Sequence, residues 1–192
     1  MPTRQAIRRR DRWADWTVFA LVAVALLLGL GLREAVLSRT VPFDFPKAGI
    51  SGRCPATWVR ETGDDPLLRA RDPFGGGCGT VIELRSRPLA AGADPAFVLD
   101  VLALERAGQE AAYRTLGTDP VQLGERTLTR RRFTYVHVDC GPFVNRPPAI
   151  VQGMDLALRE GDRIVVATLL ADEERFDADY RFLHAFIQSL EL

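Results

Sequence analysis

The chain has 192 residues, of which 47% are hydrophobic and 26% are charged, and its formal net charge is zero. By length and composition it is one folded domain with room for a short appendage. From Arg33 onward it carries 20 basic and 23 acidic residues. This net negative charge argues against nucleic acid as a partner, because phosphate binding needs a positive surface.

The N-terminus joins a basic segment to a long apolar one. Residues 1–12 contain five arginines and one aspartate, and residues 16–32 contain no charge. As a helix this run spans about 25 Å, and residues 13 and 14 extend it to about 30 Å, the thickness of a hydrocarbon core. We therefore predict a transmembrane helix over residues 13–32. Its anchoring side chains are Trp13, Trp16, Leu21, Leu26 and Leu30.

The charge asymmetry predicts the topology of this span. The basic segment 1–12 favours the cytoplasmic side, which makes 33–42 a stalk and 43–192 an extracytoplasmic domain of a single-pass cell-membrane protein. A cleaved signal peptide is the alternative. Its apolar region is usually shorter and ends at an A-x-A-like site, and the sequence from Gly31 to Ser38 offers no such site.

The three cysteines are Cys54, Cys78 and Cys140. Outside the cytoplasm a disulfide is permitted. A Cys54–Cys78 bridge would close a loop of about 25 residues and contribute roughly 3.5 kcal/mol in the chain-entropy model. Three unlinked thiols are the alternative.

The first half of the domain reads as short strands followed by a helix. Strands are expected near 43–46, 57–60 and 67–70, and the alternation over 80–86 is typical of a strand. Residues 48–52 are expected to form a turn. Asp94 followed by Pro95 predicts a helix start, and apolar spacing extends this helix to about Arg114.

The second half reads as hairpins followed by a helix. A strand pair is expected around Gly124, an alternating strand over 131–140, and a hairpin of 150–159 with 163–170. Asp177 is expected to cap a final helix with an apolar stripe. Short turns favour antiparallel pairing, so we predict an α+β fold in which two amphipathic helices cover a mainly antiparallel sheet, behind the transmembrane helix.

The closing segment FDADYRFLHAFIQSLEL, with Phe186, Ser189 and Leu190, resembles the last helix of PsbP-like and Mog-type α/β sandwiches. The segment Pro46…Gly49…Trp58 and the middle helix occupy corresponding places, so the resemblance covers about residues 43–192. That family includes extrinsic luminal subunits of photosystem II, a Ran-binding protein and bacterial surface lipoproteins. The resemblance implies a binding or assembly role without catalysis.

Candidate sites are few. His137 and Asp139 share a strand face and could bind a metal or act as a base with its orienting carboxylate, but two groups do not make a site, and a solvated or hydrogen-bonded strand face is the favoured interpretation. The Arg130–Arg132 run reads as a solvated edge. We expect no cofactor and no metal. The loop 140–148, with Phe143, Asn145 and Arg146 between prolines, is the expected contact surface, since prolines lower the ordering cost of binding.

Three functional hypotheses follow. The first is an anchored, non-catalytic binding or accessory protein that contacts a membrane complex or the envelope. The second is a structural subunit that associates through its transmembrane helix, where Gly29 and Gly31 permit close helix contact without forming a G-x-x-x-G motif. The third is a metal-dependent or hydrolytic enzyme that uses His137 and Asp139.

Overall fold

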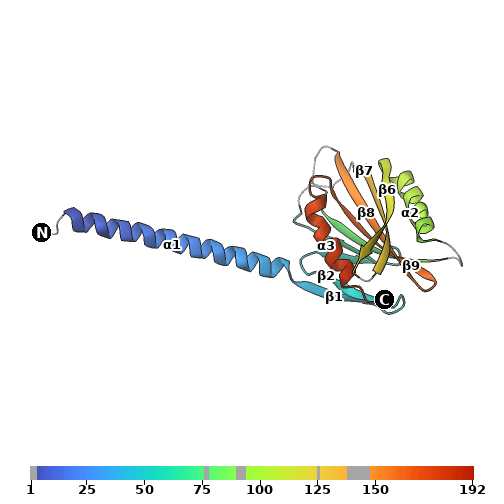
Figure 1. Cartoon of the computed structure of the whole chain (residues 1–192), viewed down its shortest axis with the longest axis horizontal. Coiled ribbons are helices and arrows are strands. Elements are labelled where there is room, and N and C mark those ends of the chain that lie inside the picture. The colour runs from blue at the N-terminus through green and yellow to red at the C-terminus, as the bar shows by residue number, and fades with distance from the viewer. Residues whose placement is uncertain (1–3, 76–77, 90–93, 125, 138–147) are drawn as a thin grey trace. The chain divides into compact units, whose positions relative to one another are not determined.

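A computed structural model describes residues 4–75, 78–89, 94–124, 126–137 and 148–192 (Figure 1). The chain divides into two compact units, Met1–Arg39 and Thr40–Leu192. The elements are α1 (Arg4–Leu37), β1 (Thr40–Phe45), β2 (Ile50–Pro55), β3 (Val59–Thr62), β4 (Leu68–Arg71), β5 (Val81–Pro88), α2 (Pro95–Gln109), β6 (Ala111–Leu123), β7 (Arg126–His137), β8 (Ala149–Glu160), β9 (Arg163–Asp172) and α3 (Phe176–Gln188).

The first unit consists almost entirely of helix α1, which has 34 residues. In the part of the chain that the structure describes, no helix is both long enough and apolar enough to cross a membrane. The transmembrane helix predicted over 13–32 is therefore not found. Within α1 the side chains at 4–15, 17, 34 and 37 are outside the described part.

The second unit is built on a seven-stranded sheet with the order β3-β4-β5-β9-β8-β7-β6, and β1 and β2 form a separate ribbon. Every neighbouring pair is antiparallel, as the short turns predicted. The hairpin of β8 and β9 confirms the pattern read from the sequence. Gly161 turns this hairpin with a φ of 59°, a conformation that glycine adopts without steric cost.

The two helices of this unit cover opposite faces of the sheet, which makes an α+β sandwich of three layers (Figure 1). On β9, Val165, Ala167 and Leu169 belong to the core beneath α3 and the β1–β2 ribbon. The alternate residues Ile164 and Val166 pack under α2. Successive side chains of a strand point to opposite faces, so this central strand is buried on both sides.

Helix α2 begins as predicted and ends earlier than predicted. The Asp94 side chain accepts a hydrogen bond from the Ala96 backbone N–H, and Pro95 takes the first helical position. The helix stops at Gln109 and not near Arg114. The reason is tertiary, since the residues from Ala111 onward pair with β7, and strand pairing overrides local helix propensity.

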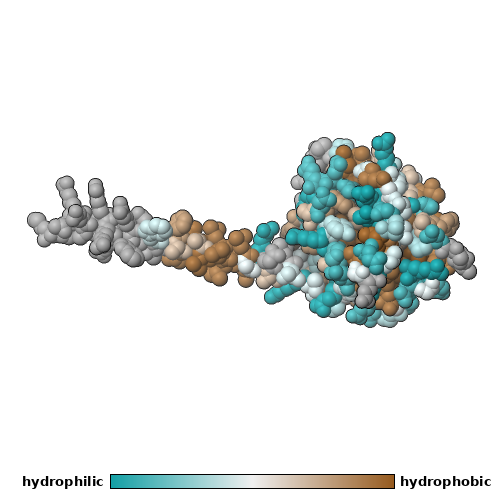
Figure 2. All heavy atoms as spheres, viewed as in Figure 1, coloured by the Kyte–Doolittle hydropathy of each residue, from teal (hydrophilic) through white to brown (hydrophobic). Residues whose placement is uncertain are grey.

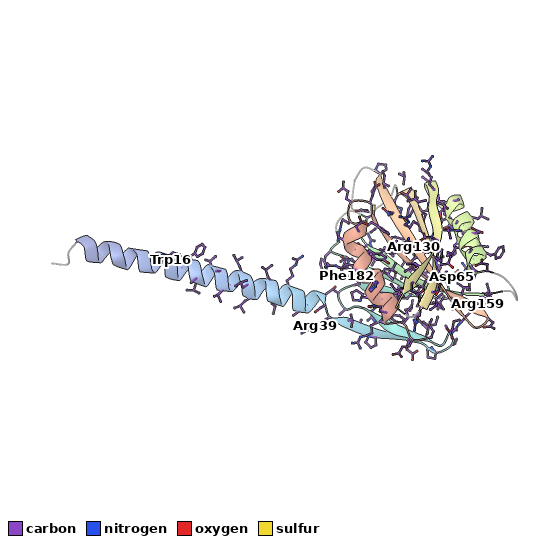
Figure 3. All side chains as sticks on the ribbon, viewed as in Figure 1. Trp16, Arg39, Asp65, Arg130, Arg159 and Phe182 are labelled. Atoms are coloured by element: carbon purple, nitrogen blue, oxygen red, sulfur yellow. The ribbon has the colours of Figure 1, made fainter. Side chains whose placement is uncertain are left out.

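Two other sequence predictions are corrected. The turn expected over 48–52 is found at residues 46–49, but residues 50–52 belong to strand β2, where Gly52 lies against the Phe43 ring and Leu190. Helix α3, which carries Phe182 (Figure 3), starts at Phe176 behind Arg175, so Asp177 lies in the first turn and does not cap the helix. An acid in that position is favourable to the helix dipole without capping it.

Gly153 on β8 gives the fold a precise test. A Cβ atom at this position would lie 2.2 Å from the ring of Phe133, which is fully buried opposite it on β7. We predict that Gly153→Ala lowers the free energy of unfolding by about 1–3 kcal/mol, because overpacking forces the buried ring to shift. Urea unfolding of the full chain measures this. Gly117→Ala is the matched control, since a Cβ there meets nothing within 4 Å; equal effects of the two substitutions would contradict the packing.

Candidate functional site

Helix α2 is attached to the sheet by a buried ion pair. Arg106 of α2 donates to both carboxylate oxygens of Asp155 on β8, at 2.6 and 2.9 Å. Asp155 is fully buried and also accepts a 2.7 Å hydrogen bond from the Thr168 hydroxyl of β9. Bidentate, charge-assisted contacts of this kind are among the strongest in proteins, so they fix the rotation of α2 about its axis.

An aromatic ring supports the same guanidinium. The Arg106 Cζ atom lies 4.4 Å from the centroid of the Phe133 ring, and the absence of a side chain at Gly153 gives that ring its place on the sheet. Tyr113 and Tyr135 flank the ring, with centroids 5.4 and 6.4 Å away. The cation thus has a carboxylate and a π face as partners.

Other charged side chains extend this network across the sheet. Arg131 of β7 is 5% exposed and donates to Asp100 of α2 at 2.5 Å. Further across the same face of the sheet, buried Glu83 of β5 pairs with Arg85 at 2.8 Å and with Arg69 at 3.6 Å. Each of these buried charges meets an opposite charge, as buried ions require.

The environment changes the acidity of two groups here. Burial lowers the pKa of Arg106, but the adjacent Asp155 carboxylate, helped by Glu83, raises the pKa overall, so the guanidinium stays charged. Burial raises the pKa of Tyr135 far above its ordinary value, and the charges of Glu110 and Glu83 raise it further. Tyr135 therefore stays a neutral phenol at physiological pH.

This arrangement links charged side chains of α2 to charged side chains of the sheet. Among the described residues, no group of three or more His, Cys, Asp or Glu side chains could hold a metal ion. The charges of the network are satisfied by one another. What the network does is hold α2 in a single orientation on the sheet.

Of the predicted pair His137 and Asp139, only His137 belongs to the residues that the structure describes. His137 Nδ1 lies 3.8 Å from a Glu110 carboxylate oxygen, at the C-terminal end of α2. Asp139 lies outside the described residues, as do Cys140 and the predicted contact residues Phe143, Asn145 and Arg146. These predictions therefore remain predictions.

The predicted Cys54–Cys78 disulfide is wrong. Cys54 is a free, buried thiol, and burial raises its pKa. It lies on β2 within the core beneath α3. Cys78 is disulfide-bonded, and its backbone N–H faces Asp172 at the end of β9. The two sequence loops looked alike, but one of them is a core strand.

The Arg130–Arg132 run divides between the faces of β7, as alternation requires. Arg130, labelled in Figure 3, donates to Asp119 of the neighbouring strand, and Arg132 is exposed. Arg131 is buried against α2, so the interpretation of the whole run as a solvated edge is wrong for this residue.

Sequence reasoning missed the central pair, although a signal was present. Asp155 lies at a core-facing position of its strand, between the apolar residues Met154 and Leu156. Arg106 follows Leu99 and Leu102 on the buried stripe of α2. A charge on each of two apolar faces predicts that they meet, because an unpaired buried charge is too costly.

The predicted anchor residues lie along α1. Trp16, Leu21, Leu26 and Leu30 are between 59% and 70% exposed, and the side chain of Trp13 is outside the described part. Figure 2 shows the apolar stretch of this helix in brown. In a folded domain, an exposed apolar surface of this length usually marks a site of interaction.

Comparisons with known proteins bear on the fold. No protein-family model matches the chain, and no curated protein matches it by sequence. It is similar to the solution structure of cyanobacterial PsbP (CyanoP) from Synechocystis sp. PCC 6803, with a TM-score of 0.56 and 8% identity over 80% of this chain and 92% of that one. It is also similar to the Saccharomyces cerevisiae Ran-binding protein Mog1p, with a TM-score of 0.52 and 14% identity over 80% and 95%.

These similarities confirm the resemblance to PsbP-like and Mog-type sandwiches that the closing helix suggested. Structural similarity at identities this low establishes the fold alone. The function has to be argued from this chain's own residues.

The Arg106–Asp155 pair gives a stability prediction. We expect Asp155→Ala to lower the free energy of unfolding by about 3–5 kcal/mol, because it leaves a buried guanidinium without its carboxylate. Replacing both partners, with Arg106→Met and Asp155→Leu, should cost much less. Asp119→Ala is the control, since its pair with Arg130 is partly solvated and contributes about 0–1 kcal/mol. Equal losses in the single and double variants would contradict the assignment.

Tyr135 gives a prediction about pH. Below its ordinary pKa of 10.0 the folded and unfolded chains both hold the phenol proton. The stability that comes from burying the neutral phenol is then fully present. As the pH rises above that value, the unfolded chain releases the proton while the folded chain keeps it. Stability then falls by up to about 1.4 kcal/mol per pH unit until the higher folded-state pKa is reached. Urea unfolding from pH 8 to 11 should show a shallower decline for Tyr135→Phe; identical declines would contradict it.

Proposed function

We propose that this chain is a membrane-anchored, non-catalytic binding or accessory protein whose 40–192 domain lies outside the cytoplasm. The observation that carries the proposal is the exposure of α1. Every large apolar side chain described between Trp16 and Leu32 is 53–71% exposed. Such a surface is unfavourable in water, at about 25 cal/mol for each Å² of apolar area.

The distribution of that exposure favours lipid over a packed partner. The consecutive residues Leu26, Leu27 and Leu28 are 63%, 68% and 68% exposed, and consecutive side chains of a helix point about 100° apart. A protein partner covers one face of a helix, whereas lipid surrounds all of it. The basic residues of 1–12 support a cytoplasmic N-terminus.

The domain itself supports a location outside the cytoplasm. Cys78 is disulfide-bonded, and disulfides persist mainly in oxidising compartments. The described core of the domain is formed by residues from 41 onward. A self-contained domain behind a helical anchor is suited to contacts near a membrane, where tethering raises its local concentration.

Membrane fractionation tests the anchor. Expressed in a bacterial host, the full chain should stay with the membrane through an alkaline carbonate wash and be released by detergent. Leu21→Arg with Leu26→Arg should move it to the soluble fraction, because a charge in hydrocarbon costs about 2.5–3.5 kcal/mol each on insertion scales. Val59→Arg, at a side chain of β3 that is 55% exposed, is the control and should change nothing. A wild-type chain that carbonate releases contradicts the anchor.

Protease added to spheroplasts tests the topology. A tag at the C-terminus should be digested in intact spheroplasts, while a tag at the N-terminus should be protected until lysis. The reverse pattern contradicts the proposed location.

Replacing α1 with an unrelated apolar helix separates this proposal from that of a subunit held by its transmembrane helix. If the domain makes the contacts, a membrane partner should still co-purify after the exchange. If the transmembrane helix makes them, co-purification should be lost.

A further inference from the structure

The three cysteines of the chain differ in their bonding. Cys54 is a free thiol, whereas Cys78 is disulfide-bonded. The third cysteine is Cys140, which lies outside the described residues. The bond of Cys78 lies within the single chain of the structure. Because Cys54 is excluded as the partner, Cys140 is the one cysteine of the sequence left to supply the second sulfur.

The sheet separates Cys54 from Cys78. Cys54 belongs to the core beneath α3. Cys78 packs against the cluster that contains Phe133, and Phe133 contacts Arg106 of α2 on the other face of the sheet. A disulfide requires that the two Cα atoms lie within about 7 Å and that the side chains point toward each other. The position of Cys54 on the opposite face therefore agrees with its free thiol.

Cys78 is held by its backbone at one end of the sheet. Its N–H lies 3.3 Å from both carboxylate oxygens of Asp172, the last residue of β9. Its carbonyl oxygen accepts a 3.2 Å hydrogen bond from the guanidinium of Arg71 on β4. The next residue, Gly79, has a φ of 80°, a conformation that favours glycine. These contacts place Cys78 beside the ends of β4 and β9.

Strand β7, which precedes Cys140 in the sequence, passes the same end of the sheet. Asp172 is opposite Val151 of β8, and Val151 is opposite Tyr135 of β7. Neighbouring strands lie about 4.7–4.9 Å apart, so about 10 Å separates the first of these residues from the last. Cys140 follows Tyr135 by five residues, and five residues of extended chain span up to about 17 Å. Cys140 is therefore within reach of Cys78.

We propose that Cys78 and Cys140 form a disulfide, which links the segment after β7 to the connection between β4 and β5. In the sheet, β9 and β8 lie between β5 and β7, so the bond joins elements that are not neighbours. The bond closes a loop of about 60 residues, and a cross-link that closes a long loop restricts the unfolded chain strongly. Its role is to stabilise this end of the sheet.

Formation of the bond is an oxidation. The two thiols release two protons and two electrons as their sulfurs join. The acceptor is the disulfide of a thiol–disulfide oxidoreductase, which passes through a mixed disulfide with one cysteine and leaves as a dithiol. Such oxidants act outside the reducing cytoplasm. With the location proposed above, the domain reaches its full stability only after export.

Peptide mapping of the full chain tests the assignment. The protein is purified in a non-ionic detergent and equilibrated with oxidised and reduced glutathione. Free thiols are then blocked with N-ethylmaleimide in mildly acidic urea, where thiol–disulfide exchange is slow. Digestion with trypsin, which cleaves after arginine and lysine except before proline, places the three cysteines on separate peptides, 54–60, 72–85 and 133–159.

We expect mass spectrometry without reduction to find 72–85 linked to 133–159, with 54–60 carrying the blocking group. Non-reducing electrophoresis should show a monomer, because the bond lies within one chain. A link from 72–85 to 54–60, a blocked 72–85 peptide after oxidation, or a disulfide-linked dimer would overturn the inference.

Thermal unfolding with and without a reductant provides a second test. Reduction should lower the Tm of the wild type by on the order of 10 °C, the shift expected for a loop of this length. Cys78→Ser and Cys140→Ser should each melt near the reduced wild type and show no further change with reductant. Cys54→Ala is the matched control. Its buried side chain makes its Tm differ from that of the wild type, but the difference between its oxidised and reduced forms should remain.

A reductant effect that persists in Cys140→Ser, or one that vanishes in Cys54→Ala, would overturn the assignment. Glutathione supplies the oxidant in these experiments, so their outcome does not depend on where the chain was made. A chain that has the expected link and washes off membranes keeps the bond and loses the anchor, and the opposite pair of results does the reverse.

Discussion

The buried ion pair between Arg106 and Asp155 determines which side chains of helix α2 face the sheet and which face outward. It joins a helix to the centre of a sheet through two hydrogen bonds to one carboxylate, with Thr168 completing the set. Phe133 lies beneath the guanidinium, and Gly153 leaves space for that ring. A buried ion pair often contributes little net stability compared with apolar residues of similar volume, whereas removal of one partner is strongly destabilising. Its role here is to define the rotation of α2.

That rotation divides the side chains of α2 into two groups. Val98, Leu99 and Leu102 contribute to the core, and the only base is withdrawn from the surface. What faces outward is the apolar stripe of Phe97, Val101 and Leu104. The same sheet is covered on its other side by α3 and the β1–β2 ribbon. Both faces of the central strands are therefore covered.

Much of this architecture was predictable from local signals. Asp94 with Pro95 marked the start of α2, alternation marked β7, and the β8–β9 hairpin followed from Gly161 and its polar neighbours. The end of α2 was not predictable locally, because residues 111–123 become a strand only by pairing with β7. Strand β2 was missed for the same reason: its glycine and cysteine fit a turn until Phe43 and Leu190 pack against it. The Arg106–Asp155 pair was even harder to predict, because the two residues are 49 positions apart in the sequence.

Hydrogen exchange in the Asp155→Asn chain tests the central claim most directly. Asparagine keeps the shape of aspartate and removes the charge that faces Arg106. If the ion pair holds α2 in place, amides of residues 95–109 lose protection selectively, while those of β9 and α3 keep it, because local opening has its own free energy. Unchanged protection of α2, or a uniform loss across the whole domain, would contradict the account.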